Sequence, residues 1–325
     1  MVQTEQEINE LLKNDPFIKL WENNYSHNFL EEHFNKATVR PLMFLVNTAP
    51  YQRIPVVLVV AGPSIDKNIK VLKQYENNAI IVCADVILFK LLEHGIKPDF
   101  VVNVDPHASI TRFIAHLDTS DLCLVCPTTT NPKTLETWKG RIFFYNQTDV
   151  ANNPKGLALK RITRSTQGWG SIFNQFFIGA TMLQFSAILR PSIVILAGYD
   201  FAYTDNKAYC DGFMHLKIYT DWGSIEAEGH GDVIKQLEKD ELKKELEVQL
   251  SNKTSIWTSK TLHFYKQSFM MLVQSLRIPI INSTEGGILV EVPNIPLEKA
   301  MQTHCSSPIV KKDVFALPKR KRKRR

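Results

Sequence analysis

The hydrophobic pattern of the chain is a series of short apolar runs, each ending in glycine, acidic or hydroxyl residues. The clearest run, Val56 to Val60, is unbroken and rich in β-branched residues, which is typical of a strand buried on both faces. The turn Gly62-Pro63-Ser64 follows, and apolar residues then recur with helical spacing at Ile65, Ile69 and Leu72. This stretch predicts a central strand, a tight turn and a helix.

The alternation of strand and helix continues along the chain. Short buried strands that alternate with helices form parallel sheets with right-handed crossovers. We therefore predict an α/β fold with a mainly parallel, Rossmann-like sheet flanked by helices. The further predicted strands cover residues 79–84, 100–104, 122–125, 141–145, 192–197 and 279–282.

Changes in the pattern predict the domain organisation. Residues 1–50 show helical spacing and read as an N-terminal helical cap, whereas residues 51–300 carry the strand and helix units of one nucleotide-binding domain. Within this domain, residues 204–255 mix turn residues, aromatics and a charged helical stretch, which indicates a lid or insertion. Residues 301–325 lack periodicity and are predicted to be a disordered basic tail.

Charge and cysteine content bear on partners and compartment. The net charge of +6 belongs to the tail, because the final KRKRKRR run alone carries +7 and leaves the first 318 residues at −1. Such a run is expected to contact polyanions non-specifically, and no nucleic-acid site is indicated elsewhere. The five cysteines are odd in number and lie mostly in apolar runs, which favours a reducing compartment. With no apolar run of transmembrane length, we expect a cytoplasmic protein without a membrane span.

Candidate ligand residues follow the strands at their carboxyl ends, which share one edge of a parallel sheet. After the first strand, Gly62 allows close approach of a ligand, Ser64 offers a hydroxyl, and the first helical turn offers free N–H groups for a phosphate. A plain helix cap at Ser64 is the alternative interpretation. Neither a GxGxxG nor a GxxxxGK[ST] pattern is present. The cofactor-site candidates are Gly62, Pro63, Ser64, Asp85, Asp105, Thr128, Ser171, Thr284 and Glu285.

Catalytic candidates come from the same edge and from the predicted lid. Asp105 and His107 share one loop, Asp200 follows the strand at 192–197, and His215 lies in the lid. Carboxylates there can hold Mg²⁺ or a ribose hydroxyl, and the general base is expected to be His107, His215 or an Asp. A second polar loop, Ser165 to Ser171, is predicted to feed the N-terminus of an apolar helix from Ile172 to Leu189.

Four motifs in this order resemble a known family: AGPSID at 61–66, the stretch from Cys83 through HGIKPDFVVNVDP to Pro106, GYDFAY at 198–203, and INSTEGG at 281–287. They are similar to the 6-hydroxymethylpterin diphosphokinase MptE-like family, which includes the central domain of bacterial motility accessory factors. The resemblance covers about residues 40–300. It implies a sialyltransferase-like nucleotide-binding fold, although Ala61 stands where the sialyltransferase loop has asparagine.

The resemblance implies two activities. The first is transfer of a nonulosonic acid from a CMP-sugar to a hydroxyl of flagellin or of a glycan, with no cofactor. The second is transfer of diphosphate from ATP to a hydroxymethylpterin, for which Asp105 and Asp200 would hold Mg²⁺. A non-catalytic nucleotide-binding module is the third hypothesis.

Overall fold

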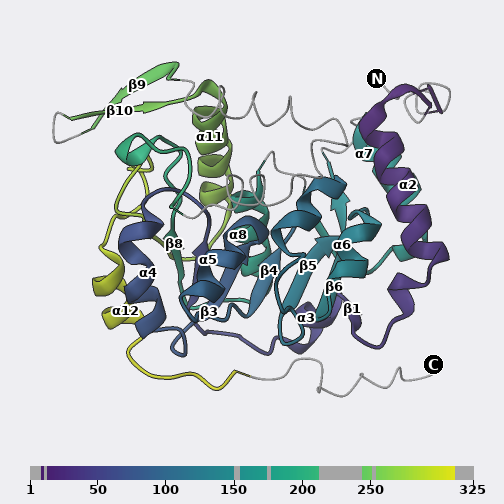
Figure 1. Cartoon of the computed structure of the whole chain (residues 1–325), viewed down its shortest axis with the longest axis horizontal. Coiled ribbons are helices and arrows are strands. Elements are labelled where there is room, and N and C mark those ends of the chain that lie inside the picture. The colour runs from purple at the N-terminus through teal and green to yellow at the C-terminus, as the bar shows by residue number, and fades with distance from the viewer. Residues whose placement is uncertain are drawn as a thin grey trace.

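The computed structural model describes residues 9–10, 13–149, 154–173, 177–211, 244–250 and 254–311, and within these ranges it forms a parallel nine-stranded sheet flanked by helices (Figure 1). A separate two-stranded hairpin is antiparallel. The predicted fold class is confirmed, and all seven strands that the hydrophobic pattern predicted are present within a few residues.

The bounds of the elements are as follows. The large sheet consists of β1 (Val39–Pro41), β2 (Val56–Val59), β3 (Ile80–Ala84), β4 (Phe100–Val102), β5 (Cys123–Pro127), β6 (Arg141–Thr148), β7 (Ser171–Phe173), β8 (Val194–Ala197) and β11 (Ile280–Asn282). The hairpin consists of β9 (Leu246–Gln249) and β10 (Ser255–Thr258). The α-helices are α2 (Pro16–Leu30), α3 (Met43–Thr48), α4 (Ile65–Gln74), α5 (Leu88–Glu93), α6 (Pro132–Thr137), α7 (Pro154–Ile162), α8 (Ile178–Ile188), α11 (Lys260–Ser275) and α12 (Leu297–His304). The 3-10 helices are η1 (His33–Asn35), η2 (Asp85–Ile87), η3 (Ala108–Phe113), η4 (Arg164–Thr166) and η5 (Thr204–Asn206).

The strand order creates a reversal point between β2 and β8. The strands lie in the order β1-β6-β5-β4-β3-β2-β8-β11, with β7 beside β6. The chain builds outward from β2 through β3, β4, β5 and β6, and then returns to place β8 on the other side of β2. Right-handed crossovers in opposite directions put their helices on opposite faces, so α4, α5 and α6 cover one face and α8 covers the other (Figure 1). Ligands of open α/β sheets bind outside the carboxyl ends of strands at such a reversal point.

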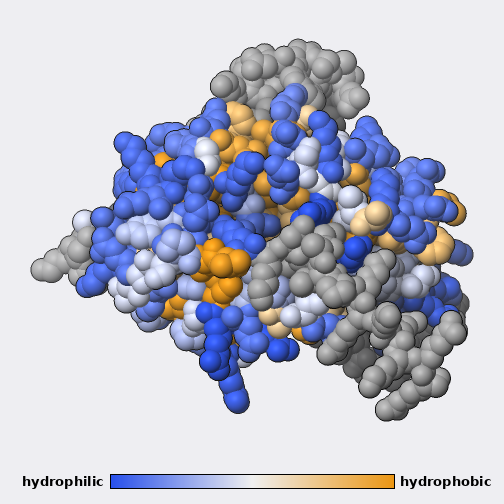
Figure 2. Space-filling view, turned by 90° about the horizontal axis from the view of Figure 1, so that it is seen from below, coloured by the Kyte–Doolittle hydropathy of each residue, from blue (hydrophilic) through white to orange (hydrophobic). Residues whose placement is uncertain are grey.

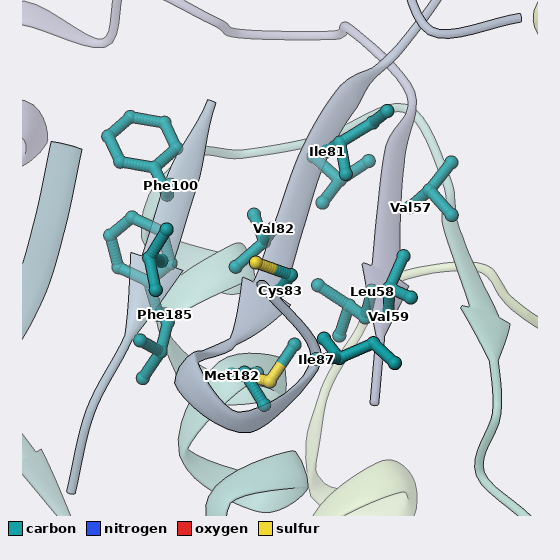
Figure 3. Packing of buried hydrophobic residues seen from close by; sticks show 14 of the residues in the cluster. Val57, Leu58, Val59, Ile81, Val82, Cys83, Ile87, Phe100, Met182 and Phe185 are labelled. Carbon is teal, nitrogen blue, oxygen red and sulfur yellow. The ribbon is translucent and has the colours of Figure 1, made fainter. Parts of the chain in front are cut away.

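The core is packed around the central strands and α8. Every residue of β2 and β3 is buried, which explains why these strands read as continuous apolar runs. Met182 and Phe185 of α8 pack against this layer, and the ring of Phe185 lies 5.1 Å from that of Phe100 in an edge contact (Figure 3). Burial of each such side chain contributes roughly 2–3 kcal/mol. The core thereby fixes α8 against β2, β3 and β4.

The N-terminal segment is joined to the sheet rather than only capping it. The carboxylate of Asp15 caps α2 by accepting hydrogen bonds from the N–H groups of Phe17 and Ile18. The helical spacing of residues 1–50 did not predict β1, which lies in this segment and pairs in parallel with β6. A three-residue edge strand containing proline shows no period of its own, so the pattern could not reveal it.

The helix predicted from Ile172 to Leu189 is wrong at its start. Residues 171–173 form β7, and α8 begins only at Ile178. The stretch is mostly apolar, and the short polar pair Asn174-Gln175 is too little for periodicity to separate its strand and helix parts. Ser171 therefore lies on an exposed edge strand beside β6 and not at a helix N-terminus.

The face at the amino ends of the strands is built partly by residues near the C-terminus. Helix α12 packs on α4, and the Lys311 Nζ donates a hydrogen bond to Asp99 Oδ2 at 2.8 Å. Residues 301–311, which the sequence assigned to the tail, are thus folded here. This face is mostly hydrophilic, with apolar side chains in small separate groups (Figure 2).

Some predictions fall outside the described residues. The predicted lid lies mostly in residues 212–243 and 251–253, so His215 has no described position, and the same holds for the KRKRKRR run. Across the ranges that the structure does describe, no helix combines the length and apolar character that a bilayer crossing requires.

Candidate functional site

A pocket of about 180 Å³ lies at the reversal point, outside the carboxyl ends of β2 and β8. Its lining brings together residues that are far apart in the sequence, because parallel strands deliver their carboxyl ends to one edge. The lining is mostly apolar and aromatic, which is typical of small-molecule sites. It includes Gly62, Phe177, Gly179, Asp200, Tyr209 and Tyr265.

Three of the predicted motifs meet at the buried carboxylate of Asp200. Its Oδ2 accepts a hydrogen bond from Ser64 Oγ at 2.7 Å, and its Oδ1 accepts one from Thr204 Oγ1. Gly286, from the INSTEGG motif, packs so closely that an added Cβ would lie 2.9 Å from Asp200 Oδ1. The structure therefore joins AGPSID, GYDFAY and INSTEGG into one hydrogen-bonded unit that forms the floor of the site.

Gly62 and Ser64 are used for this internal packing. A Cβ at Gly62 would lie 2.1 Å from both Asp200 Oδ2 and Gly198 O, so the missing side chain admits the neighbouring loop. Ser64 is fully buried and makes no side-chain cap to α4. The N–H groups of Ile65 and Asp66 already donate to Gly62 O and Pro63 O, each at 3.2 Å. The start of α4, which the sequence predicted as the phosphate site, thus has most of its donors in use.

The sequence pattern did not predict that the N-terminus of α8 lies at this pocket. Phe177, Ile178 and Gly179 line the pocket. The side chain of Phe177 accepts no hydrogen bond from the first N–H groups of α8, although its carbonyl accepts one from the Ala180 N–H at 3.3 Å. Helix N-termini carry positive partial charge and unpaired donors. Tyr199 holds this end of α8 in place, because its hydroxyl donates to Gly179 O at 3.1 Å. A correct helix start would have been the signal needed to find it.

Aromatic rings cover the pocket beside α8. The rings of Phe177 and Tyr265 are stacked, with centroids 5.1 Å apart and planes inclined by 20°. Tyr209 adds a further ring at the rim, where 44% of its surface is exposed. Flat apolar surfaces of this kind suit a nucleobase or another planar ring.

Burial raises the pKa of two carboxyls at this edge. The pKa of Asp200 is raised to about 6 by burial, against which the hydrogen bonds from Thr204 and Ser64 act. The pKa of Asp85 is also raised to about 6 by burial, although Asn103 Nδ2 donates to its Oδ2 at 2.7 Å and Val86 N donates to its Oδ1 at 2.8 Å. These two acids therefore change charge near neutral pH, unlike exposed carboxyls.

Asp105 and His107 form an exposed pair after β4. Asp105 Oδ1 lies 2.7 Å from His107 Nδ1 and also accepts a hydrogen bond from the His107 N–H at 2.8 Å. A carboxylate that holds one ring nitrogen orients the other nitrogen and favours its action as a base. The ring of His107 also packs edge-on against Phe17 of α2 at 5.4 Å. The pair stands two strands beyond Gly62, because β3 lies between β2 and β4.

Other predicted residues have structural partners or lie elsewhere. Thr284 Oγ1 accepts from the Tyr199 N–H at 3.1 Å, and Glu285 Oε1 accepts from the Leu297 N–H at 2.7 Å, so both support the GYDFAY loop and α12. Thr128 Oγ1 donates to Asn146 Oδ1 at 2.9 Å and is fully buried. Ser171 lies on β7, which pairs with β6 near one end of the strand order, whereas the pocket lies at β2 and β8 toward the other end.

Helix α2 covers the strand ends after β4 and β5. The buried amide of Asn28 donates to Thr128 O at 3.2 Å and to Thr130 O at 2.9 Å, and that of Asn24 donates to Pro106 O and Thr129 O. The carbonyls after β4 and β5 are therefore satisfied from α2 rather than by a ligand or water.

Substitution of Asn28 by leucine is expected to lower the free energy of unfolding by about 2 kcal/mol, because two buried carbonyls lose a donor. The matched control is Asn23→Leu on the exposed face of the same helix, which should change stability by less than about 0.5 kcal/mol. Urea denaturation of the two variants measures the difference. Equal losses would show that these bonds do not stabilise α2.

The structure does not support one Mg²⁺ ion held by Asp105 and Asp200. Their strands, β4 and β8, stand three places apart, which is roughly 14 Å at the usual strand spacing. Asp105 is paired with His107, and Asp200 is held by Ser64 and Thr204. These two residues do not fit a shared ion, so we derive no step through one.

Comparison with known proteins gives one family and one fold. The family model described as 6-hydroxymethylpterin diphosphokinase MptE-like matches residues 27–206. No curated protein matches the chain. Among solved structures, the chain is similar to the MAf glycosyltransferase from Magnetospirillum magneticum AMB-1, with a TM-score of 0.56 and 14% sequence identity. The similarity covers 80% of this chain but only 39% of that one, and at this identity it shows a shared fold.

Proposed function

The chain belongs to the 6-hydroxymethylpterin diphosphokinase MptE-like family, and from this premise we propose that it is a glycosyltransferase using a nucleotide-sugar donor. The observation that carries the proposal is the pocket at the reversal point, where aromatic rings and the N-terminus of α8 lie together. A nucleotide needs both a flat apolar surface for its base and donors for its phosphate. The fold shared with the MAf glycosyltransferase supports the same assignment.

The pocket divides the donor between two surfaces. The base packs on the stacked pair of Phe177 and Tyr265 or on Tyr209, and the phosphate faces the first turn of α8 beside Gly62. Preorganised N–H donors at a leaving phosphate stabilise the charge that develops as the glycosidic bond breaks. The ordered loop around Asp200 keeps Gly62 and α8 at a fixed separation, which is what preorganisation requires.

The Asp105 and His107 pair supplies the base in this proposal. His107 accepts the proton of the acceptor hydroxyl, while Asp105 orients the ring and stabilises its charged form. The transition state at the anomeric carbon has oxocarbenium character and carries positive charge, so a carboxylate close to that carbon stabilises it. By the resemblance of its motifs, the donor is a CMP-linked nonulosonic acid and the acceptor a hydroxyl of flagellin or of a glycan, with no metal cofactor.

A diphosphokinase is the second candidate, and the description of the matching family model favours it. That reaction requires Mg²⁺ between the ATP phosphates. The separation of Asp105 from Asp200 gives no support to the ion site that the sequence predicted for it. Dependence of binding on Mg²⁺ separates the two functions.

The test is a thermal-shift series with CMP, CDP, UDP, GDP and ATP, each with and without Mg²⁺. A ligand at 100 times its Kd stabilises the folded state by roughly 2.7 kcal/mol, which raises the Tm by several degrees. We expect CMP to stabilise without metal and Tyr209→Ala to reduce the shift. Phe29→Ala, also an exposed aromatic but outside this pocket, is the matched control.

A second variant separates binding from transfer. His107→Ala should keep the CMP-induced shift and lose transfer from the CMP-sugar by about 100-fold or more. Stabilisation by ATP only together with Mg²⁺ would replace the proposal by the diphosphokinase. A CMP shift without any transfer by the wild type would leave a nucleotide-binding module.

A further inference from the structure

A cluster of potential metal ligands lies away from the pocket, where α2, η1 and α6 meet. His27 of α2, His33 of η1 and Glu136 of α6 each place one nitrogen or oxygen atom within 4.8 Å of the other two. His27 Nε2 lies 3.9 Å from Glu136 Oε1, and the rings of His27 and His33 are nearly parallel at 6.3 Å. In Figure 1, α2 and α6 stand on the opposite side of the sheet from β8, so this cluster is separate from the candidate site.

The ring of His33 is buried, and only one of its two nitrogens has a hydrogen-bond partner in the described residues. Only 6% of the residue is exposed, and its Nε2 is buried without a hydrogen-bond partner in the described part of the chain. Nδ1 has a partner, because Lys36 Nζ lies 2.8 Å away. The buried Nε2 is therefore positioned as a ligand atom without a competing partner in the described residues.

We propose that His27, His33 and Glu136 bind one Zn²⁺ ion. Two imidazole nitrogens and one carboxylate oxygen are a common protein donor set for zinc, with a water in the fourth position. Imidazole donors disfavour Ca²⁺ and Mg²⁺, which prefer oxygen. The side chain of His27 is 46% exposed and that of Glu136 is 56% exposed. An ion can therefore reach both side chains, and both can rotate toward it. The bound ion would cross-link α2 and η1 to α6.

Binding changes the tautomer of His33. While the Lys36 ammonium donates to Nδ1, the ring proton lies on Nε2, where it has no acceptor. Zinc needs the Nε2 lone pair, so the proton moves to Nδ1 and the exposed Lys36 side chain turns into solvent. His33 releases no net proton in this exchange. Lys36 thus competes with the ion, and Lys36→Met should bind zinc more tightly than the wild type.

The experiment is zinc titration of the full chain, purified without a histidine tag, in competition with a colorimetric zinc chelator. We expect one equivalent to bind. His27→Ala and Glu136→Gln should weaken binding by at least about 100-fold, the upper end of what even outer-shell changes cost. Both residues are exposed, so these variants should fold. The matched control, His304→Ala, removes an exposed histidine from α12 and should bind zinc like the wild type.

Two further measurements test the geometry. Co²⁺ in place of Zn²⁺ should give the intense visible absorption of a tetrahedral site, and Zn²⁺ should raise the Tm of the wild type but not of His27→Ala. Absence of stoichiometric binding would overturn the proposal. So would undiminished binding by His27→Ala and Glu136→Gln, or equal weakening by His304→Ala.

Discussion

Replacing Gly198 with alanine is expected to lower the free energy of unfolding by about 2–5 kcal/mol. The residue has a φ of +77°, where a side chain costs roughly 1–2 kcal/mol. Its Cβ would also lie 2.2 Å from the carbonyl oxygen of Val60, which belongs to the backbone and cannot rotate away. Relief of that overlap requires the loops after β2 and β8 to separate, at a further cost of roughly 1–3 kcal/mol.

Gly168→Ala is the matched control for this experiment. Gly168 also has a positive φ, +89°, but nothing lies within 4 Å of its added Cβ. The free energy of unfolding of Gly168→Ala should fall only by the cost of a side chain at positive φ, about 1–2 kcal/mol. Guanidinium denaturation of both variants gives the difference, and equal losses would mean that the contact between the two loops is not tight. Because the same contact sets the pocket floor, Gly198→Ala should also weaken any nucleotide-induced shift.

The stability of the protein is expected to contain a component that falls as the pH rises from about 4 to above 6. Asp200 has a pKa of about 6 when folded, compared with about 3.9 when unfolded. The unfolded state therefore loses its proton first, so the contribution is complete below the unfolded pKa and is lost as the pH rises through 6. A shift of about two pKa units corresponds to about 3 kcal/mol.

Asp200→Asn isolates this component, because the amide stays neutral and can keep bonds to Ser64 and Thr204. The stability of the variant relative to the wild type should rise by about 3 kcal/mol between pH 4 and pH 8, measured by urea denaturation at each pH. Asp85→Asn should behave alike, since burial raises the pKa of Asp85 to about 6 as well. Asp121→Asn, at an exposed carboxylate, is the control and should show no such trend. A pH-independent difference for Asp200→Asn would contradict the buried acid.

The fold could be predicted from the sequence because its strands are buried on both faces. Val56 to Val60 and its counterparts appear as continuous apolar runs, which only a covered parallel sheet explains. The sheet edge at which the candidate pocket lies could be predicted for the same reason. β1 and the start of α8 could not be predicted, because a three-residue strand and a mostly apolar stretch carry no usable period.

Predicting which residues meet in the candidate site requires the strand order and the contacts between loops, which local sequence patterns do not contain. Strand order decides that Asp200 adjoins Gly62 while Asp105 stands three strands from Asp200. Local sequence also could not show that Gly62 and Ser64 contact another loop of the same chain, since a glycine and a hydroxyl serve a ligand or a neighbour equally well. The sequence thus identified residues that build the site but not which of them face the ligand.

The two asparagines of α2 make the ligand edge asymmetric. Because they occupy the carbonyls after β4 and β5, that half of the edge is sealed against polar guests, whereas the half at β2 and β8 opens into the pocket. Among the described residues, the open half is where a donor of the proposed kind would bind, and the Asp105 and His107 pair stands beside it, after β4. If the proposed reaction occurs here, an acceptor hydroxyl would have to reach His107 from the solvent, because that side chain is exposed beside the covered half of the edge.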